Sequence, residues 1–244
     1  MVSSVEELNA ALEKVPQGGQ VIIRLNPSDT PYTNIQHGKN KTITLMGQEG
    51  VTLQMITSAT TLGASDPTFE GSRLRLENMT VQAARTGNHQ GFACQSIEME
   101  NGIINGSMQL FAPAVFEQCH FINQNAKEYC IETNGQNLTL TDCDFVTYGK
   151  AVLVEHTGGQ DHTVQASSCL FSDSTDGQAN RNAVFVTFSD GGTGTCHLLL
   201  DDCTIQRGFA VSKKGNATGS KLWSNDNRMD DAMLNVTIDG QPVH

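Results

Sequence analysis

Hydrophobic and polar residues alternate along most of this chain, in short runs separated by turn residues. The runs are rich in β-branched and aliphatic side chains and are bounded by Gly, Asn, Asp and Pro, as is typical of β-strands. Early examples are residues 21–25, 42–45 and 51–53. Near the N-terminus, apolar residues instead recur at helical spacing over residues 5–15, after a capping-box sequence that begins at Ser4. The sequence therefore predicts an all-β protein that begins with one short amphipathic α-helix.

A six-residue phrase recurs from residue 76 onward and divides the chain into similar units. In each copy, apolar residues lead into a polar residue, then an Asn or Cys at the fourth position, then in most copies an apolar residue. The fourth positions are Asn78, Asn101, Cys119, Cys143, Cys169, Cys203 and Asn227. Counting the strand-like runs between copies gives about three short strands and three turns in each unit. Such self-similarity, with strands and no helices between the copies, predicts a β-solenoid.

The repeat resembles the right-handed parallel β-helices of the pectin-lyase-like superfamily, in which Asn side chains at one turn position stack from coil to coil. This resemblance implies a right-handed parallel β-helix of about eight coils. It also implies that the Asn and Cys positions form a buried structural ladder without chemistry of its own. In a single domain of 244 residues, we expect residues 1–19 to cap the N-terminal end, residues 20–229 to form the coils and residues 230–244 to cap the C-terminal end.

A narrower resemblance covers residues 3–54, which look like the opening of the pectin methylesterases. It rests on a helix that ends in Val-Pro and on the strand end Lys-Thr-Ile-Thr-Leu-Met-Gly at residues 41–47. The catalytic Gly-Tyr-Gln-Asp-Thr-Leu and Asp-Phe-Ile-Phe-Gly motifs of that family are absent, as is the Gly-His-Gly motif of polygalacturonases. Gln90, in residues 88–93, is similar to the first glutamine motif of the methylesterases but lacks its partner motifs. The resemblance therefore concerns fold, and fold alone does not imply function.

The charge balance narrows the range of partners. The chain has 26 acidic and 15 basic residues and a formal net charge of −11. A nucleic-acid partner requires a basic surface that neutralises phosphates, so no nucleic acid is expected. A polyanionic polysaccharide is disfavoured unless a cation bridges it to the protein. No apolar run is long enough to span a membrane.

The N-terminal residues are acidic and lack the pattern of a secretory signal peptide. As written, the chain is expected to be cytoplasmic. A secreted or cell-surface protein from which a leader has been trimmed would look the same, so the compartment stays open.

The cysteines are seven in number and include no Cys-x-x-Cys pair, which argues against a full disulfide framework and against a zinc ribbon. We expect Cys119, Cys143, Cys169 and Cys203 to be small buried thiols stacked on one another. A disulfide between adjacent coils is the alternative, because a strand spacing of about 4.8 Å is compatible with one.

Candidate catalytic residues lie a similar number of residues after two of these cysteines. Glu132 follows Cys119 and Glu155 follows Cys143 at the ends of corresponding predicted strands. If these strand ends align, the carboxylates lie about 4.8 Å apart, near the separation used by retaining glycoside hydrolases. His156 follows directly and completes the candidate catalytic set. The alternative is that both glutamates are solvated strand-end residues.

Candidate ligand-binding residues lie in the turns that follow. Asp161 and His162 occupy the next turn, and the longest repeat unit adds polar insertions that contain Asp173, Asp176 and Asp190. Insertions in solenoids often build a binding face. Calcium is the only cofactor these carboxylates suggest, but their spacing matches neither an EF-hand nor the nonapeptide calcium repeat, so no metal site is assigned.

These observations favour a binding or scaffold module, with carbohydrate as the preferred ligand. The competing hypothesis is a carbohydrate-active enzyme, a polysaccharide hydrolase, esterase or lyase, with an acidic site at Glu132, Glu155 and His156. A third hypothesis, a fragment of a tailspike-like assembly, predicts a trimer. The sequence leaves the ligand and the oligomeric state open.

Overall fold

The structure of the chain is a computed structural model. It describes residues 1–33, 38–55, 70–83, 90–92, 94–125, 128–147, 150–156, 159–173, 185–189, 194–206, 229–238 and 240–242. Within these ranges there are one helix and 22 strands. The prediction of an all-β protein with one short N-terminal helix is therefore confirmed.

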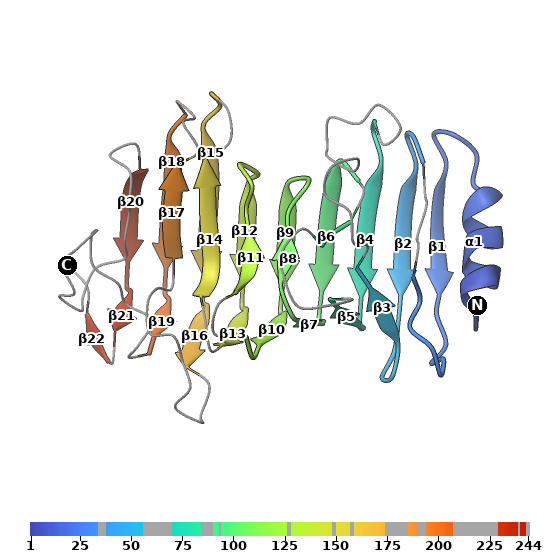
Figure 1. Ribbon diagram of the computed structural model, residues 1–244, viewed down its shortest axis with the longest axis horizontal. Helices are drawn as coiled ribbons and strands as arrows, with labels where there is room; N and C mark the ends of the chain where they lie inside the picture. Colours follow the sequence, from blue (N-terminus) through green and yellow to red (C-terminus); the bar gives the residue numbers. More distant parts are fainter. Residues whose placement is uncertain are drawn as a thin grey trace.

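Helix α1 (Val5–Glu13) begins where the capping sequence predicts. The Ser4 side chain accepts a hydrogen bond from the Glu7 backbone N–H at 3.2 Å, which satisfies one of the free donors at a helix N-terminus. Leu8 and Leu12 are buried in the core, and the helix lies beside the first strand at one end of the molecule (Figure 1). In the described part of the chain, no helix has the length and hydropathy needed to cross a membrane.

The strands form three sheets. The first contains β1 (Gln20–Arg24), β2 (Thr42–Met46), β4 (Arg73–Glu77), β6 (Ser96–Glu100), β9 (Ala114–Glu117), β12 (Leu138–Thr141), β15 (His162–Ser167), β18 (Cys196–Asp201) and β20 (Met229–Leu234). The second contains β3 (Thr52–Gln54), β5 (Thr80–Gln82), β7 (Ile103–Asn105), β10 (His120–Asn123), β13 (Asp144–Thr147), β16 (Leu170–Asp173), β19 (Thr204–Ile205), β21 (Thr237–Ile238) and β22 (Gln241–Pro242). The third contains β8 (Met108–Gln109), β11 (Tyr129–Glu132), β14 (Lys150–His156) and β17 (Phe185–Ser189).

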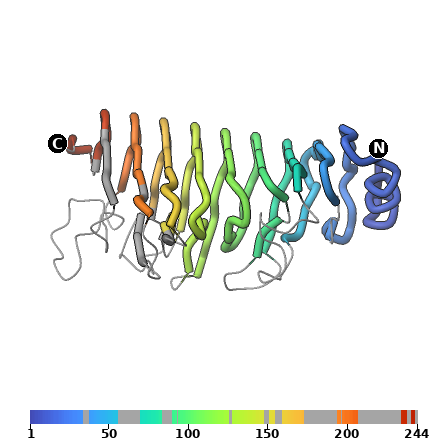
Figure 2. The backbone as a smooth tube through the Cα atoms, turned by 90° about the horizontal axis from the view of Figure 1, so that it is seen from above, coloured from blue at the N-terminus to red at the C-terminus, as the bar shows by residue number. Residues whose placement is uncertain are grey.

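The chain visits the three sheets in turn. Strands β9, β10 and β11 belong to the first, second and third sheets, and β12, β13 and β14 repeat that order. Each strand pairs in parallel with the strand one pass earlier, and among the described strands only the terminal pair β21 and β22 is antiparallel. Figures 1 and 2 show successive passes stacked along the long axis from the N-terminal helix to the C-terminus. This arrangement is consistent with a parallel β-helix.

Alternating side chains build the core. In β4, Leu74 and Leu76 are buried, and the register places them beside Ile97 and Met99 of β6. Because the register repeats from pass to pass, like side chains stack along the molecule. In the second sheet, the rings of Phe121, Phe145 and Phe171 form such a stack, with centroids 4.4 and 4.9 Å apart.

The turn between the first and second sheets holds the recurring phrase, but in a different alignment from the predicted one. The first residue of each of these two-residue turns has a left-handed backbone, with φ between 50° and 55°. These first residues are Asn78, Asn101, Gln118, Asp142, Ser168, Asp202 and Asn235. The second residue of each turn is buried. These second residues are Met79, Gly102, Cys119, Cys143, Cys169, Cys203 and Val236. The predicted equivalence of Asn and Cys is therefore wrong by one position. Left-handed backbone favours Asn, whereas the buried position favours a small apolar residue, so the Asn and Cys of the repeat belong to two neighbouring positions.

The last turn of this series also differs from the prediction. Asn235 and Val236 connect β20 to β21, and the Asp202 backbone N–H bonds to the Leu234 carbonyl at 2.9 Å. The turn series therefore continues at residue 235, and the predicted seventh position at Asn227 is wrong. Residue 227 itself lies outside the described residues.

The stacked cysteines are buried free thiols, as predicted. Cys119, Cys143, Cys169 and Cys203 carry no disulfide. The Cys143 thiol donates to the carbonyl oxygens of Thr141 and Phe116 at 3.3 and 3.4 Å. Hydrogen bonding to the preceding thiol in the stack, together with burial, raises the pKa of Cys143 and of Cys169 to about 12. These side chains act as small core residues.

Candidate ligand-binding groove

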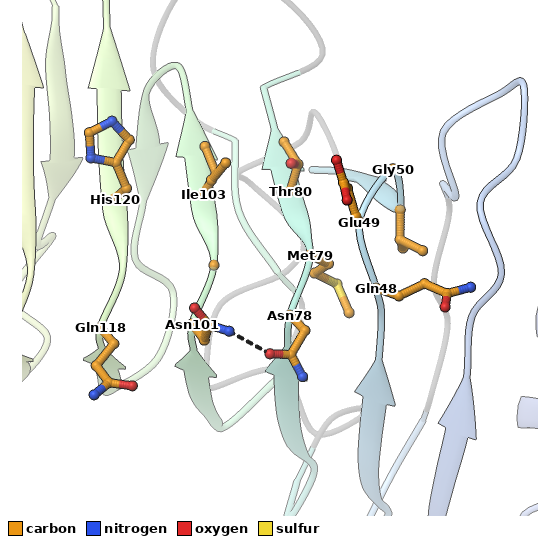
Figure 3. A pocket seen from close by; sticks show the side chains of 12 residues that line it. Gln48, Glu49, Gly50, Asn78, Met79, Thr80, Asn101, Ile103, Gln118 and His120 are labelled. Atoms are coloured by element: carbon orange, nitrogen blue, oxygen red, sulfur yellow. Dashed lines mark hydrogen bonds between the residues drawn. The ribbon is translucent and has the colours of Figure 1, made fainter.

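A groove with a volume of about 340 Å³ lies at the turns between the first and second sheets. It crosses four successive passes of the chain (Figure 3). Its lining residues are Gln48, Glu49, Gly50, Val51, Asn78, Met79, Thr80, Asn101, Gly102, Ile103, Gln118 and His120.

Unequal turn lengths produce the groove. Two residues separate β4 from β5, β6 from β7 and β9 from β10, whereas the five residues 47–51 separate β2 from β3. The longer turn stands at one end of the row of short turns, and His120 stands toward the other end (Figure 3). Gly47 lets the long turn approach its neighbour, because a Cβ atom there would lie 2.6 Å from the Asn78 carbonyl oxygen. The groove is thus a consequence of one insertion against a regular repeat.

Three carboxamides follow one another along the groove. Asn78, Asn101 and Gln118 occupy the left-handed turn positions of successive passes, and all three are exposed. Asn101 Nδ2 donates to Asn78 Oδ1 at 2.7 Å (Figure 3). This bond is a rung of the predicted ladder, but the expectation that the ladder is buried is wrong. The left-handed turn directs its side chains to the surface, where their remaining donors and acceptors are accessible to a ligand.

The His120 imidazole and the Asp144 carboxylate form a hydrogen bond beside these amides. His120 begins β10, Asp144 begins β13, and the two residues are register partners. His120 Nδ1 bonds to Asp144 Oδ2, and both side chains are partly exposed. A carboxylate only accepts hydrogen bonds, so Nδ1 carries the proton and, in the neutral ring, Nε2 presents an acceptor lone pair. On the other side of His120, its register partner Ile103 is 41% exposed and provides an apolar surface.

The electrostatic character of the groove is acidic. Its described lining includes the Glu49 carboxylate and no Lys or Arg. Arg75, in β4, is bound to Glu77, Glu98 and Glu100 at 2.6, 3.1 and 2.5 Å. The hydrogen bond to Glu77 and those to its other partners raise the pKa of Arg75. This guanidinium is thus already neutralised by carboxylates and does not supply an anion site.

Glu132, the first predicted catalytic residue, lies in the third sheet and not in the groove. Its side chain is 4% exposed and accepts a hydrogen bond from the Tyr129 hydroxyl. The register pairs Glu132 with Gln109 and with Leu153. Glu155 lies two residues further along β14 and pairs with Phe188, so the predicted alignment of the two glutamates is wrong.

The reason for the misalignment is a difference in loop length. Five residues separate β10 from β11, whereas two separate β13 from β14. The second pass therefore reaches the equivalent position three residues sooner. Glu155, which follows its cysteine one residue sooner than Glu132 does, lies two residues beyond that position. The side chains of Glu155 and His156 lie outside the described residues.

Of the predicted ligand-binding residues, Asp161 and His162 do not line the groove. The exposed Asp161 accepts a hydrogen bond from the Thr195 backbone N–H at 2.8 Å, and His162 is buried at the start of β15. The side chain of Asp173 and all of Asp176 and Asp190 lie outside the described residues. In the part of the chain that is described, no three His, Cys, Asp or Glu side chains converge in a way that would hold a metal ion.

Sequence reasoning missed the residues that line the groove beside the cysteines. Gln118 and His120 flank Cys119, and Asp144 follows Cys143. The predicted equivalence of Cys119 and Cys143 already sets His120 opposite Asp144, because each directly follows its cysteine, and this was the signal that could have found the pair.

A second feature that was missed is a set of buried amides next to Glu132. Gln90 and Gln109 are 1% and 6% exposed, and the Gln109 backbone N–H donates to the Gln90 carbonyl at 2.7 Å. The Leu110 backbone N–H donates to the Glu132 carbonyl at 2.8 Å, so these residues belong to three successive passes of the chain. The glutamine stretch around residue 90 was the only sequence signal for this set.

Comparisons of the chain with protein-family models, with curated proteins and with solved structures found no match. The groove and the buried polar set around Glu132 are the features of the described residues that bear on function. The groove is accessible to solvent, whereas Glu132 is buried.

Proposed function

We propose that the chain is a carbohydrate-binding module built on a right-handed parallel β-helix of about eight coils, of the pectin-lyase-like type. In this proposal, residues 20–229 form the coils of one domain, which is capped by residues 1–19 and 230–244. The order of strands in the three parallel sheets and the hydrogen bond between Asn101 and Asn78 support it.

The observation that carries the binding proposal is the row of exposed carboxamides in the groove. Each Asn or Gln side chain offers a carbonyl acceptor and two N–H donors, which suit the hydroxyl groups of a sugar. Strands of neighbouring coils are about 4.8 Å apart, so the row of Asn78, Asn101 and Gln118 repeats on the scale of a saccharide chain. The exposed Ile103 supplies an apolar contact for the C–H face of a sugar ring. A volume of about 340 Å³ suits a short saccharide segment.

The test begins with a glycan array, probed with and without calcium, followed by calorimetry on the glycans that bind. Asn101→Ala and Gln118→Ala should each weaken binding by about tenfold, because each removes hydrogen bonds worth roughly 1 kcal/mol or more. Gln165→Ala is the matched control, since Gln165 is an exposed amide on β15, outside the groove. Groove variants that bind as tightly as the wild type would exclude the groove as the site.

The second candidate function is a carbohydrate-active enzyme, and the buried polar set favours it. A carboxyl group bonded to the Tyr129 phenol, beside the buried Gln90 and Gln109, has the composition of an acid–base site. Glu155 and His156 remain the other proposed catalytic residues. Glu132→Gln should abolish release of reducing ends from any polysaccharide that the protein cleaves. Unchanged hydrolysis by this variant would remove Glu132 from consideration.

A further inference from the structure

We propose that the groove selects uncharged saccharides over uronates. In this proposal His120, oriented by Asp144, accepts a hydrogen bond from a sugar hydroxyl at Nε2. This inference rests on the proposed carbohydrate-binding function and adds the chemical class of the ligand. Three observations carry it: the contact between His120 and Asp144, the absence of Lys and Arg from the described lining, and the position of Glu49 in that lining.

The first step concerns the proton on His120. The Asp144 carboxylate bonds to Nδ1, which fixes the proton on that nitrogen. In the described part of the chain, the hydrogen-bond partner of this imidazole is Asp144, so Nε2 remains available to a ligand. As an acceptor, Nε2 pairs with a hydroxyl group that donates. A uronate has a carboxylate in place of the C6 hydroxyl, and because this carboxylate has no proton to give, the bond cannot form at that position.

The second step concerns charge. A uronate chain that enters the groove brings carboxylates toward Glu49 at one end and toward Asp144, beside His120, at the other. The guanidinium of Arg75 is already shared among three glutamates. Like charges at short distance repel, and the described lining supplies no cation to offset this. A neutral sugar avoids the repulsion and keeps its hydroxyl donors.

The third step concerns position. His120 and Ile103 are register partners on neighbouring strands, so the imidazole lies beside the exposed side chain of Ile103. A sugar ring packed on Ile103 can donate a hydroxyl to His120 on one side and contact the amides of Asn101 and Gln118 at the adjoining turns. His120 is thus a specificity-determining residue, and Asp144 is the residue that positions it.

The experiment compares saccharides that differ only at C6, where the uncharged sugar has a hydroxymethyl group and the uronate has a carboxylate. Calorimetry would measure tetrasaccharides of glucose, mannose and galactose against the corresponding tetramers of glucuronate, mannuronate and galacturonate. We expect the uncharged member of at least one pair to bind about tenfold or more tightly than its uronate, the scale of one hydrogen bond gained and one repulsion avoided. Equal or tighter binding of the uronate in every pair that binds would overturn the inference.

Variants of His120 and Asp144 test whether these two residues cause the preference for uncharged saccharides. His120→Phe keeps a ring but removes the acceptor, and Asp144→Ala leaves the ring without its fixed proton position. Each should reduce the preference for the neutral sugar by about tenfold, whereas Gln165→Ala should leave it unchanged. A preference that survives both variants would contradict the role of the pair.

A spectroscopic measurement tests the positioning role of Asp144 without any ligand. Two-bond ¹H–¹⁵N correlation spectra, with the His120 signals assigned by their loss in His120→Phe, should report a proton on Nδ1 in the wild type. They should report a mixture of tautomers in Asp144→Ala. A proton on Nε2 in the wild type would overturn the inference, whatever the protein binds. If Nδ1 carries the proton but no saccharide of either class binds, the carbohydrate function fails and the selectivity inference falls with it.

Discussion

The side chain of Asn101 donates a hydrogen bond of 2.7 Å to that of Asn78, one coil earlier, and both residues have a left-handed backbone. The two asparagines therefore perform two tasks: they allow the turn, and they present amides to the groove. These tasks can be separated, because glycine adopts the left-handed backbone without an amide, and a β-branched residue cannot adopt it without strain.

Substitutions at Asn101 should separate folding from binding. Asn101→Gly should change the free energy of unfolding by less than about 1 kcal/mol and still weaken glycan binding. Asn101→Val should destabilise the protein by about 1–3 kcal/mol, since valine is strained at a φ of 50°. Urea unfolding followed by circular dichroism measures the stability, and calorimetry measures binding. Equal stability of the glycine and valine variants would contradict a structural role for the left-handed turn.

The phenylalanine stack should be the most sensitive part of the core. Phe145 is fully buried, with its ring 4.4 Å from that of Phe121 and 4.9 Å from that of Phe171. Phe145→Ala should destabilise the protein by about 3–5 kcal/mol, because it removes both ring contacts and leaves a cavity. Phe145→Leu, the conservative control, should cost less. Thermal unfolding of both variants would reveal the difference, and similar losses would indicate that the ring contacts, and not the volume that leucine restores, carry the stability.

The buried thiols predict a loss of stability in alkali. Cys143 and Cys169 have pKa values near 12 in the folded protein, above the value of about 8.5 for a free thiol. The folded state therefore holds these protons more tightly than the unfolded state. The resulting stability is complete below about pH 8.5 and declines as the pH rises from there toward 12. Urea midpoints measured from pH 7 to 10 should fall for the wild type.

The control for this prediction is Cys143→Ala combined with Cys169→Ala. This variant should be less stable at pH 7 because of its smaller side chains, but its midpoint should depend less on pH in the alkaline range. In the native wild type, both thiols should also react with a disulfide reagent at pH 8 only after unfolding. Rapid labelling of either cysteine in the folded protein would contradict their burial.

The sequence predicted the class of fold well, because alternation and repetition act over the whole chain. The runs around Leu74 and Leu138 specify buried strands whatever the loops between them do, and the helix start at Ser4 follows from local hydrogen bonding. The groove could not be predicted in the same way. It depends on which residues become neighbours between coils, and loop lengths decide that register.

The pairs His120 with Ile103 and Glu132 with Leu153 illustrate this limit. Each pair is distant in sequence, and an error of one residue at the turn, or of three in a loop, changes the partner. The burial of a polar side chain is a second property that the local sequence does not reveal. Nothing in the sequence around Glu132 indicates that its carboxylate is buried against Tyr129.

Gly47 offers a test of how the groove is built. A Cβ atom at this position would lie 2.6 Å from the Asn78 carbonyl oxygen and 2.8 Å from the Cβ of Met79, so Gly47→Ala must displace the 47–51 turn or the coil beside it. We expect a loss of about 1–3 kcal/mol in the free energy of unfolding and weaker glycan binding, because this turn forms one wall of the groove.

Gly38→Ala is a useful comparison for Gly47→Ala. Gly38 directly precedes the turn at residues 39–40, and a Cβ atom there would meet nothing within 4 Å, so its cost comes only from its φ of 62°. Gly38→Ala should therefore lower stability without changing glycan affinity, whereas Gly47→Ala should change both. Calorimetry on both variants distinguishes the two cases. If Gly47→Ala binds glycans with wild-type affinity, the long turn does not shape the binding site, and the ligand contacts lie among the short turns alone.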